Sequence, residues 1–293
     1  MSHKFGGDWT LEKLERVRKY LSAYTTLMKG NPRSRHFRIA YIDAFAGTGY
    51  RTVKSEDNPN QLLMPELAED EPQGFLDGSA TIALKIEPRF DSYIFIEKDK
   101  KRFSELQKLK EDFPDFKENI RLVQSDANSY IMDLCKKDWS KNRAVLFLDP
   151  YGMQVEWQTV VAVANTQAID LWYLFPLGMG LHRLLAKDGK ISLALQQRLN
   201  RLLGQPDWFN YFYQDDVTLS MFGEETNTRK IANTDFLERY FVSRLRTVFP
   251  AVADNPLILR NSNNSPMYLL CFASSNPKGG PTAIRIAQDI LKK

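Results

Sequence analysis

The stretch from His36 to Gly49 constrains the fold more than any other part of this chain. Its apolar run ends at Asp43 and is followed by a turn that contains Gly47 and Gly49. A strand that is buried in a parallel sheet has this near-continuous apolar character, and α/β folds bind their ligands at the carboxyl end of such strands. Glycine lets a ligand approach the backbone closely, because it carries no Cβ. The stretch therefore predicts a buried parallel strand that leads into a ligand-binding turn.

Two other glycine motifs fail on spacing. A dinucleotide fingerprint, Gly-x-Gly-x-x-Gly, requires glycine at the position of Thr52. A phosphate-binding P-loop requires Gly-Lys-Ser/Thr, whereas Gly49 is followed by Tyr50 and Arg51. An ordinary strand-to-helix turn remains an alternative. The spacing Asp-x-Phe-x-Gly-x-Gly resembles instead the first motif of S-adenosylmethionine-dependent methyltransferases, in the version found in enzymes that modify nucleic-acid bases.

Composition fits one large α/β domain with excursions. Of the 293 residues, 43% are hydrophobic, which is enough for a sizeable core. Cys135 and Cys271 are the only cysteines, so a disulfide framework and a cysteine-rich metal site are excluded. No apolar run is long enough to span a bilayer and no signal peptide is recognisable, so we expect a cytoplasmic protein without membrane partners. The net charge of +4 permits RNA or DNA as a partner without requiring either.

Apolar runs later in the chain predict the rest of a parallel sheet. Four runs are typical of strands and alternate with helical periodicity, as in α/β folds. Two closing strands joined by a short polar link predict a C-terminal antiparallel hairpin. We predict a single domain over residues 1–293 with a Rossmann-like, mostly parallel, seven-stranded sheet. The runs are 92–96, 120–124, 143–148 and 168–175, and the closing strands are 257–260 and 267–273.

Three segments depart from this alternation. Residues 1–35 contain an amphipathic helix over 8–28, in which Lys13 and other charged residues fall away from the apolar face. The segment 50–78, inserted directly after the glycine turn, lacks periodicity and is typical of a lid, a binding loop or a disordered insert. The segment 180–232 is predicted to be a helical excursion.

An aromatic cluster lies within that excursion. Arg198 and Arg201 are close enough in sequence for the cluster to recognise a single nucleic-acid strand by stacking and phosphate contact. Packing of a small helical core explains the same residues, and we favour it. The cluster consists of Trp208, Phe209, Tyr211, Phe212 and Tyr213.

A carboxylate stands at the end of each of the next two strands. Glu97 ends the second, where nucleoside-binding folds place an acid that accepts hydrogen bonds from ribose hydroxyls. An exposed strand-end carboxylate is the alternative. In the methyltransferases that the chain resembles, the position of Asp126 accepts a hydrogen bond from the adenine amino group, and Asp126 is equally suited to cap the next helix. Lys98 and Ala127 adjoin these acids and complete the predicted cofactor site with them.

The fourth strand leads into Asp149-Pro150-Tyr151-Gly152. Pro150 cannot donate to a sheet ladder and marks the strand's end, and Gly152 permits a tight turn. A plain turn is the alternative. The tetrapeptide resembles the Asp/Asn-Pro-Pro-aromatic motif of methyltransferases that modify exocyclic amino groups, but it lacks the second proline. It is closer to the Asp-Pro-Phe-Gly of tRNA guanine-N2 methyltransferases, which leaves the target atom open.

Taken together, these segments resemble the three-Cys-motif partner proteins over most of the chain. The amino-terminal Trp9-Thr10-Leu11-Glu12-Lys13-Leu14 and the strand ends around Asp43, Glu97 and Asp149 carry the resemblance. It implies a class I methyltransferase fold, S-adenosylmethionine as cofactor, and association with a separate three-Cys-motif protein that is similar to radical-SAM enzymes. The family carries no firmly assigned reaction.

These expectations define a methyltransferase site without a metal. Asp43 would orient the amino-acid end of the cofactor, directly or through the amides of the turn, and Phe45, Ala46, Gly47, Thr48 and Gly49 would approach its methionine moiety. Glu97 would hold the ribose. Asp149, which also borders the cofactor, and the Pro150 carbonyl would align the acceptor nitrogen, with Tyr151 stacking on the base. The alternative is a scaffold or binding protein that keeps the fold but transfers no methyl group.

Overall fold

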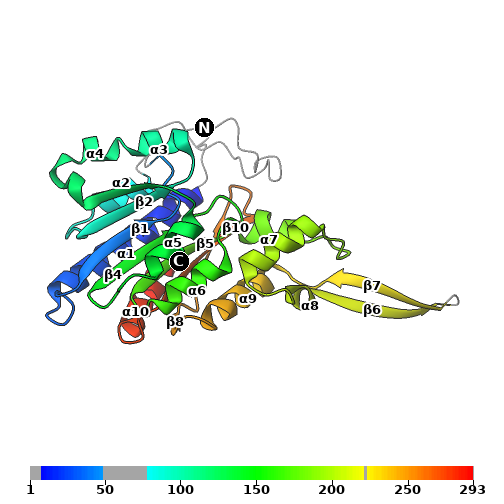
Figure 1. The fold of residues 1–293 in the computed structure, drawn as a ribbon. Coiled ribbons are helices and arrows are strands. Elements are labelled where there is room, and N and C mark those ends of the chain that lie inside the picture. Colours follow the sequence, from blue (N-terminus) through cyan, green and yellow to red (C-terminus); the bar gives the residue numbers. More distant parts are fainter. Residues whose placement is uncertain (1–7, 49–77, 221–222, 293) are drawn as a thin grey trace, which may run out of the picture.

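The structure, a computed structural model, describes residues 8–48, 78–220 and 223–292 (Figure 1). Gly49 and nearly all of the predicted insertion lie outside these residues. A central sheet with helices on both of its faces makes up the body of the protein. Among the described helices, none combines the length and the apolar character that crossing a membrane would require.

The sheet is mostly parallel, as predicted. Its strand order is β3-β2-β1-β4-β5-β10-β8, with β9 also paired to β10. The pairs among the first five strands are parallel and those of β10 are antiparallel. This confirms the Rossmann-like fold class and the closing hairpin. The strands are β1 Arg38–Asp43, β2 Ser92–Glu97, β3 Ile120–Gln124, β4 Asn142–Leu148, β5 Ile169–Phe175, β8 Ala251–Val252, β9 Leu257–Arg260 and β10 Pro266–Ser274.

The described sheet has eight strands, where seven were predicted. The difference lies at its outer edge, where β8 and β9 pair with different parts of the long strand β10. Leu257 to Arg260 pairs with its first half, and Ala251 and Val252 pair with Ala273 and Ser274 at its end. The two-residue strand β8 is too short to have a recognisable pattern in the sequence.

Two apolar layers cover the sheet. On one face α1, α2 and α10 pack against inward side chains such as Tyr41 and Trp172, and on the other α5, α6 and α9 pack against Ile42 and Leu146. Alternate residues of β1 thus serve opposite cores, as the period of a strand requires. The helices are α1 Asp8–Gly30, α2 Ser79–Leu84, α3 Lys100–Leu106, α4 Leu109–Asp112, α5 Ala127–Cys135, α6 Trp157–Asn165, α9 Thr234–Arg246 and α10 Gly280–Leu291, with shorter turns at Pro114–Asn119 and Leu177–His182.

The excursion after β5 contains the predicted helices and, in addition, a hairpin. Helices α7 (Leu193–Leu203) and α8 (Trp208–Phe212) lead into the antiparallel strands β6 (Tyr213–Ser220) and β7 (Gly223–Lys230). The hairpin extends away from the body of the protein (Figure 1). A purely helical excursion was therefore an incomplete prediction.

Core packing of the aromatic cluster is confirmed for most of its members. Trp208, Phe212 and Tyr213 are buried, and the indole of Trp208 donates a hydrogen bond to Asn200. Tyr211 alone is largely exposed. These rings therefore hold the small helices together, and they do not form an open stacking platform.

Candidate active site at the carboxyl edge of the sheet

The predicted acidic residues meet at the point where the strand order reverses. Strand β1 lies between β2 and β4, so the chain leaves β1 toward one side of the sheet and later returns on the other. Open α/β sheets bind ligands in the crevice outside the strand ends at such a point. Asp43 is the last residue of β1, and Asp149 directly follows β4, two residues beyond the partner of Asp43 in the ladder.

Asp43 is a fully buried carboxylate. Ser79 Oγ donates a hydrogen bond of 2.5 Å to its Oδ2, and the backbone N–H of Phe45 donates one of 3.2 Å to its Oδ1. Burial raises the pKa of Asp43 to about 7; these hydrogen bonds and Lys13 oppose the rise, and the charge of Asp149 adds to it. A buried carboxylate without a full counter-charge attracts a cation or holds a proton.

The turn after β1 leaves the backbone at Gly47 uncovered by the other described residues. Ala46 is anchored by its N–H, which donates to the carbonyl of Ile96 in the neighbouring strand, over 3.0 Å. Gly47 has φ +59°, a conformation that favours glycine, and a Cβ built on it would meet no atom of the described residues within 4 Å. Phe45 and Thr48 flank the turn and are half-buried. The turn thus has room for a ligand against its backbone.

Lys13 provides the counter-charge at Asp149. Its Nζ lies 2.5 Å from Asp149 Oδ2, and the two side chains are 6% and 22% exposed. The lysine also lies over the ring of Trp9, with Nζ 5.3 Å from the ring centroid. Among the described residues, no other hydrogen bond to the Asp149 carboxylate is present, so Oδ1 is available to a ligand.

The periodicity of the helix places Lys13 away from the apolar face, yet the structure buries its side chain at the end of β4. The long aliphatic stem lets the side chain pass along Trp9 while its ammonium reaches the strand end. The motif search also missed Ser79, which begins α2. Neither residue has a sequence signal of its own, because each acts on an acid that is distant in the chain, over 136 residues for Lys13 and 36 for Ser79.

The turn after Asp149 has the predicted shape. Pro150 is buried at the end of the strand, and Gly152 has φ +69°, which favours glycine at this position. Tyr151 is half-buried, with its hydroxyl out of contact with solvent. This places the tetrapeptide beside Asp43, where a group bound to the Asp149 carboxylate would also lie near the glycine turn.

Glu97 lies at the end of β2 and is only 8% exposed, so the alternative of an exposed strand-end acid is wrong. Its Oε1 accepts a hydrogen bond from the N–H of Asp99 over 2.7 Å. Burial raises its pKa, opposed by this bond and by the charge of Arg102. The adjoining Lys98 is exposed, and its Nζ lies 3.2 Å from Asp126 Oδ2.

Asp126 caps α5. Its Oδ1 accepts hydrogen bonds from the N–H groups of Asn128 and Ser129, over 3.1 and 3.3 Å. The capping alternative is therefore confirmed, and contact with an adenine amino group stays a prediction that would use Oδ2 beside Lys98. Ala127 is buried behind it as the first residue of the helix.

Comparison with solved structures supports the fold described above. No family model matches the chain, and no relative was found among curated proteins. Among solved structures, LPL1258 from Legionella pneumophila, described by the family model DUF519, is 12% identical with a TM-score of 0.50, over 99% of this chain and 92% of that chain. The two chains share a fold.

Weaker likenesses do not extend this result to function. One is the N-terminal domain of EvdMO1 with SAH bound, 12% identical, with a TM-score of 0.41 over 89% of this chain and 80% of that chain. Another is spermidine synthase from Thermotoga maritima, 10% identical, with a TM-score of 0.41 over 92% and 60%. The resemblance to three-Cys-motif partner proteins stays a prediction.

Proposed function

We propose that this protein is an S-adenosylmethionine-dependent methyltransferase that acts on an amino group of a nucleic-acid base. The observation that carries the proposal is the meeting of Asp43 and Asp149 at the ends of two adjacent parallel strands, at the switch point of the sheet. A crevice with one acid for the cofactor and one for the acceptor is what transfer between two bound molecules requires.

The residues around Asp43 fit the cofactor. S-adenosylmethionine supplies an activated methyl group on a positively charged sulfur, together with an ammonium group. Such a cation would compensate the Asp43 carboxylate, whose pKa burial raises to about 7. The backbone from Phe45 to Thr48 has space for the methionine part, and Glu97 would accept hydrogen bonds from the ribose. Asp126, between Lys98 and Ala127, would meet the adenine.

Asp149 would orient the acceptor nitrogen. Lys13 donates a hydrogen bond to Oδ2, while Oδ1 would accept an N–H of the target amine. The Pro150 carbonyl would accept the second N–H, and Tyr151 would stack on the base. The target nitrogen would release a proton as it is methylated, and Asp149 would receive that proton.

The ion pair between Lys13 and Asp149 also favours a second candidate function. A lysine that saturates the acceptor-orienting carboxylate would leave a fold that binds the cofactor without turning it over. In that case the protein would serve as a scaffold or binding partner of the three-Cys-motif protein that the sequence resemblance implies.

Calorimetry followed by a transfer assay separates these candidates. We expect S-adenosylmethionine and S-adenosylhomocysteine to bind the intact protein, and Asp43→Ala and Glu97→Ala to weaken both. Asp149→Ala should abolish transfer of labelled methyl to RNA or DNA while leaving cofactor affinity largely intact. Asp133→Ala, an exposed acid on α5 away from the crevice, is the matched control. Cofactor binding without transfer to RNA or DNA, with or without the partner, would favour the scaffold. Failure to bind cofactor in the partner's presence too would refute the proposal.

A further inference from the structure

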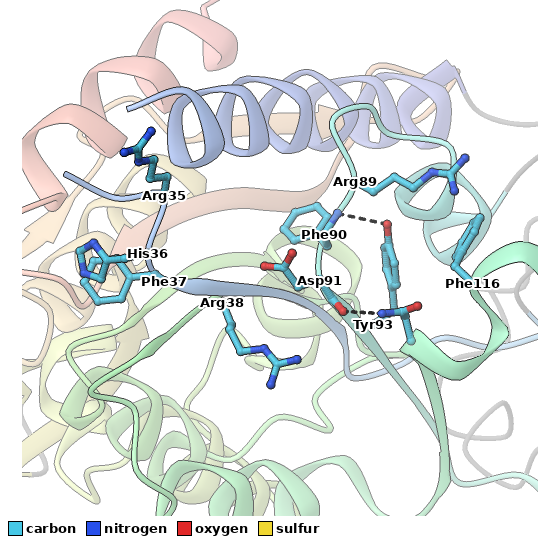
Figure 2. Close-up of a pocket in the computed structure, with 10 residues that line it drawn as sticks. Arg35, His36, Phe37, Arg38, Arg89, Phe90, Asp91, Tyr93 and Phe116 are labelled. Atoms are coloured by element: carbon cyan, nitrogen blue, oxygen red, sulfur yellow. Dashed lines mark hydrogen bonds between the residues drawn. The ribbon is translucent and has the colours of Figure 1, made fainter. Parts of the chain in front are cut away.

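A second concave site lies at the other end of the strands, where β1 and β2 begin. A hollow of about 520 Å³ is formed where β1 begins, in front of β2, and beside the turn at Pro114–Asn119 (Figure 2). This volume falls in the range of small-molecule sites. The hollow is separated from Asp43 by the length of β1, six residues or roughly 17 Å. It is therefore distinct from the proposed methyl-transfer site.

The hollow has an excess of positive charge. Arg35, Arg38 and Arg89 line it, and Asp91 is its single acid. Arg35 and Arg38 are exposed and make no ion pair or hydrogen bond through their side chains within the described part of the chain. A concave surface that holds unpaired guanidinium groups attracts anions, because its walls exclude part of the screening solvent.

The acid in the hollow is already engaged. Asp91 Oδ2 accepts a hydrogen bond from the N–H of Ile39 over 2.8 Å, and its Oδ1 lies 3.2 Å from Lys29 Nζ. Lys29, which does not line the hollow, thus balances the charge of Asp91. The carboxylate therefore does not cancel the charge of Arg35 and Arg38.

Flat groups border the same hollow. The exposed ring of His36 lies against Phe37, with ring centroids 4.0 Å apart, and the Arg89 guanidinium lies 4.5 Å from the centre of the Phe116 ring. Figure 2 shows the two pairs at opposite ends, with Arg38 between them. Imidazole rings and guanidinium planes held in this way are surfaces on which a nucleobase stacks.

We propose that this hollow binds a phosphate ester of a nucleotide. Arg38, which lies between the two pairs in Figure 2, would hold the phosphate oxygens by charge-assisted hydrogen bonds, which the planar guanidinium group makes in pairs, and Arg35 would add its positive charge. The base would stack on His36 or on the outer face of Arg89. The phosphate can belong to a free nucleotide or to a nucleic-acid strand, and the site does not depend on the proposed methyl transfer.

The test compares wild-type protein with two double variants. Arg35→Gln/Arg38→Gln removes the unpaired cations, and Arg33→Gln/Arg246→Gln removes the same charge from exposed positions outside the hollow. The probes are inorganic phosphate, adenosine monophosphate and a short fluorescent single-stranded RNA, each titrated without S-adenosylmethionine. Circular dichroism and thermal melting check that all three proteins are folded.

We expect Arg35→Gln/Arg38→Gln to lower the affinity for the probes tenfold or more, which is about the effect of losing one charged hydrogen bond. The control variant Arg33→Gln/Arg246→Gln should bind as tightly as wild-type protein. For RNA, the slope of log affinity against log salt should become shallower by about 0.7, because the contact with one phosphate is lost. Binding of adenosine monophosphate as tightly as RNA would identify a free nucleotide as the ligand, and binding of RNA alone would identify a strand. Equal affinity in both double variants, or no binding of any probe to wild-type protein, would overturn the proposal.

Discussion

Replacing Asp43 by asparagine should make the protein more stable at the expense of cofactor binding. Asparagine has the same shape, and its amide can accept from the Phe45 N–H and donate to Ser79 Oγ, so both local contacts survive. What disappears is a charge that burial disfavours. Since the pKa of Asp43 rises from 3.8 to about 7, ionised Asp43 costs the folded state about 4 kcal/mol at 25 °C.

The stability advantage of Asp43→Asn over wild-type protein should increase with pH. The pKa of Asp43 is raised in the folded state, from 3.8 to about 7. As the pH rises from about 4 to about 7, the unfolded chain therefore releases this proton first, and wild-type protein loses stability relative to the variant. Of the 4 kcal/mol, about 1–2 kcal/mol has developed at pH 5 and the rest by pH 8. The advantage of Asp43→Asn should thus grow by about 3 kcal/mol between these two pH values and then level off.

Urea unfolding followed by circular dichroism at pH 5 and pH 8 measures this growth directly. A gain of this size corresponds to an increase of roughly 6 °C in melting temperature for a domain of this length. Asp133→Asn, an exposed acid, is the control and should give the same difference from wild type at both pH values. Parallel curves for wild type and Asp43→Asn would refute the assignment of a buried, destabilising carboxylate.

Two further predictions concern packing and the ion pair. Lys13→Met keeps the stem but leaves Asp149 unpaired beside Asp43, so we expect a loss of about 1–3 kcal/mol in urea unfolding. Adding Asp149→Asn should recover much of that loss, and a double-mutant cycle with no coupling would contradict the pairing. Gly178→Ala would place a Cβ 1.6 Å from a backbone oxygen of β10, which no side-chain rotation relieves, so the melting temperature should fall by several degrees. Gly30→Ala, where a Cβ meets nothing within 4 Å, should leave it nearly unchanged, and equal effects of the two substitutions would contradict the close approach.

The sequence was most informative where a residue's role depends on its own segment. Asp43, Glu97 and Asp149 were placed correctly at strand ends, because apolar runs that end in an acid and a turn report both the strand and its carboxyl edge. The closing hairpin was predicted for a similar local reason, the short polar link between two apolar strands. The positions of these acids relative to one another follow from the strand order.

The misses have physical reasons of two kinds. Lys13 is charged and lies on an amphipathic helix, so its periodicity alone predicts exposure, and only packing over a distant strand end reverses that prediction. Beyond its first pair, the described side chains of the hairpin β6–β7 are largely exposed, so they show no alternation of buried and exposed residues. A strand with exposed residues such as Asp216, Val217 and Arg229 has no pattern to recognise.

That hairpin is energetically separate from the rest of the domain. Tyr213 is buried and Lys230 donates to the carbonyls of His182 and Leu185, but beyond this first pair the described side chains are largely exposed, and β6 and β7 hydrogen-bond only with each other. A two-stranded ribbon has little stability alone, so its amides should exchange with solvent through local opening long before the central sheet unfolds. Local opening of the ribbon should therefore leave the stability of the central sheet unchanged. Length and sequence beyond that first pair can therefore vary at little cost to the fold, which leaves the ribbon open to evolutionary change.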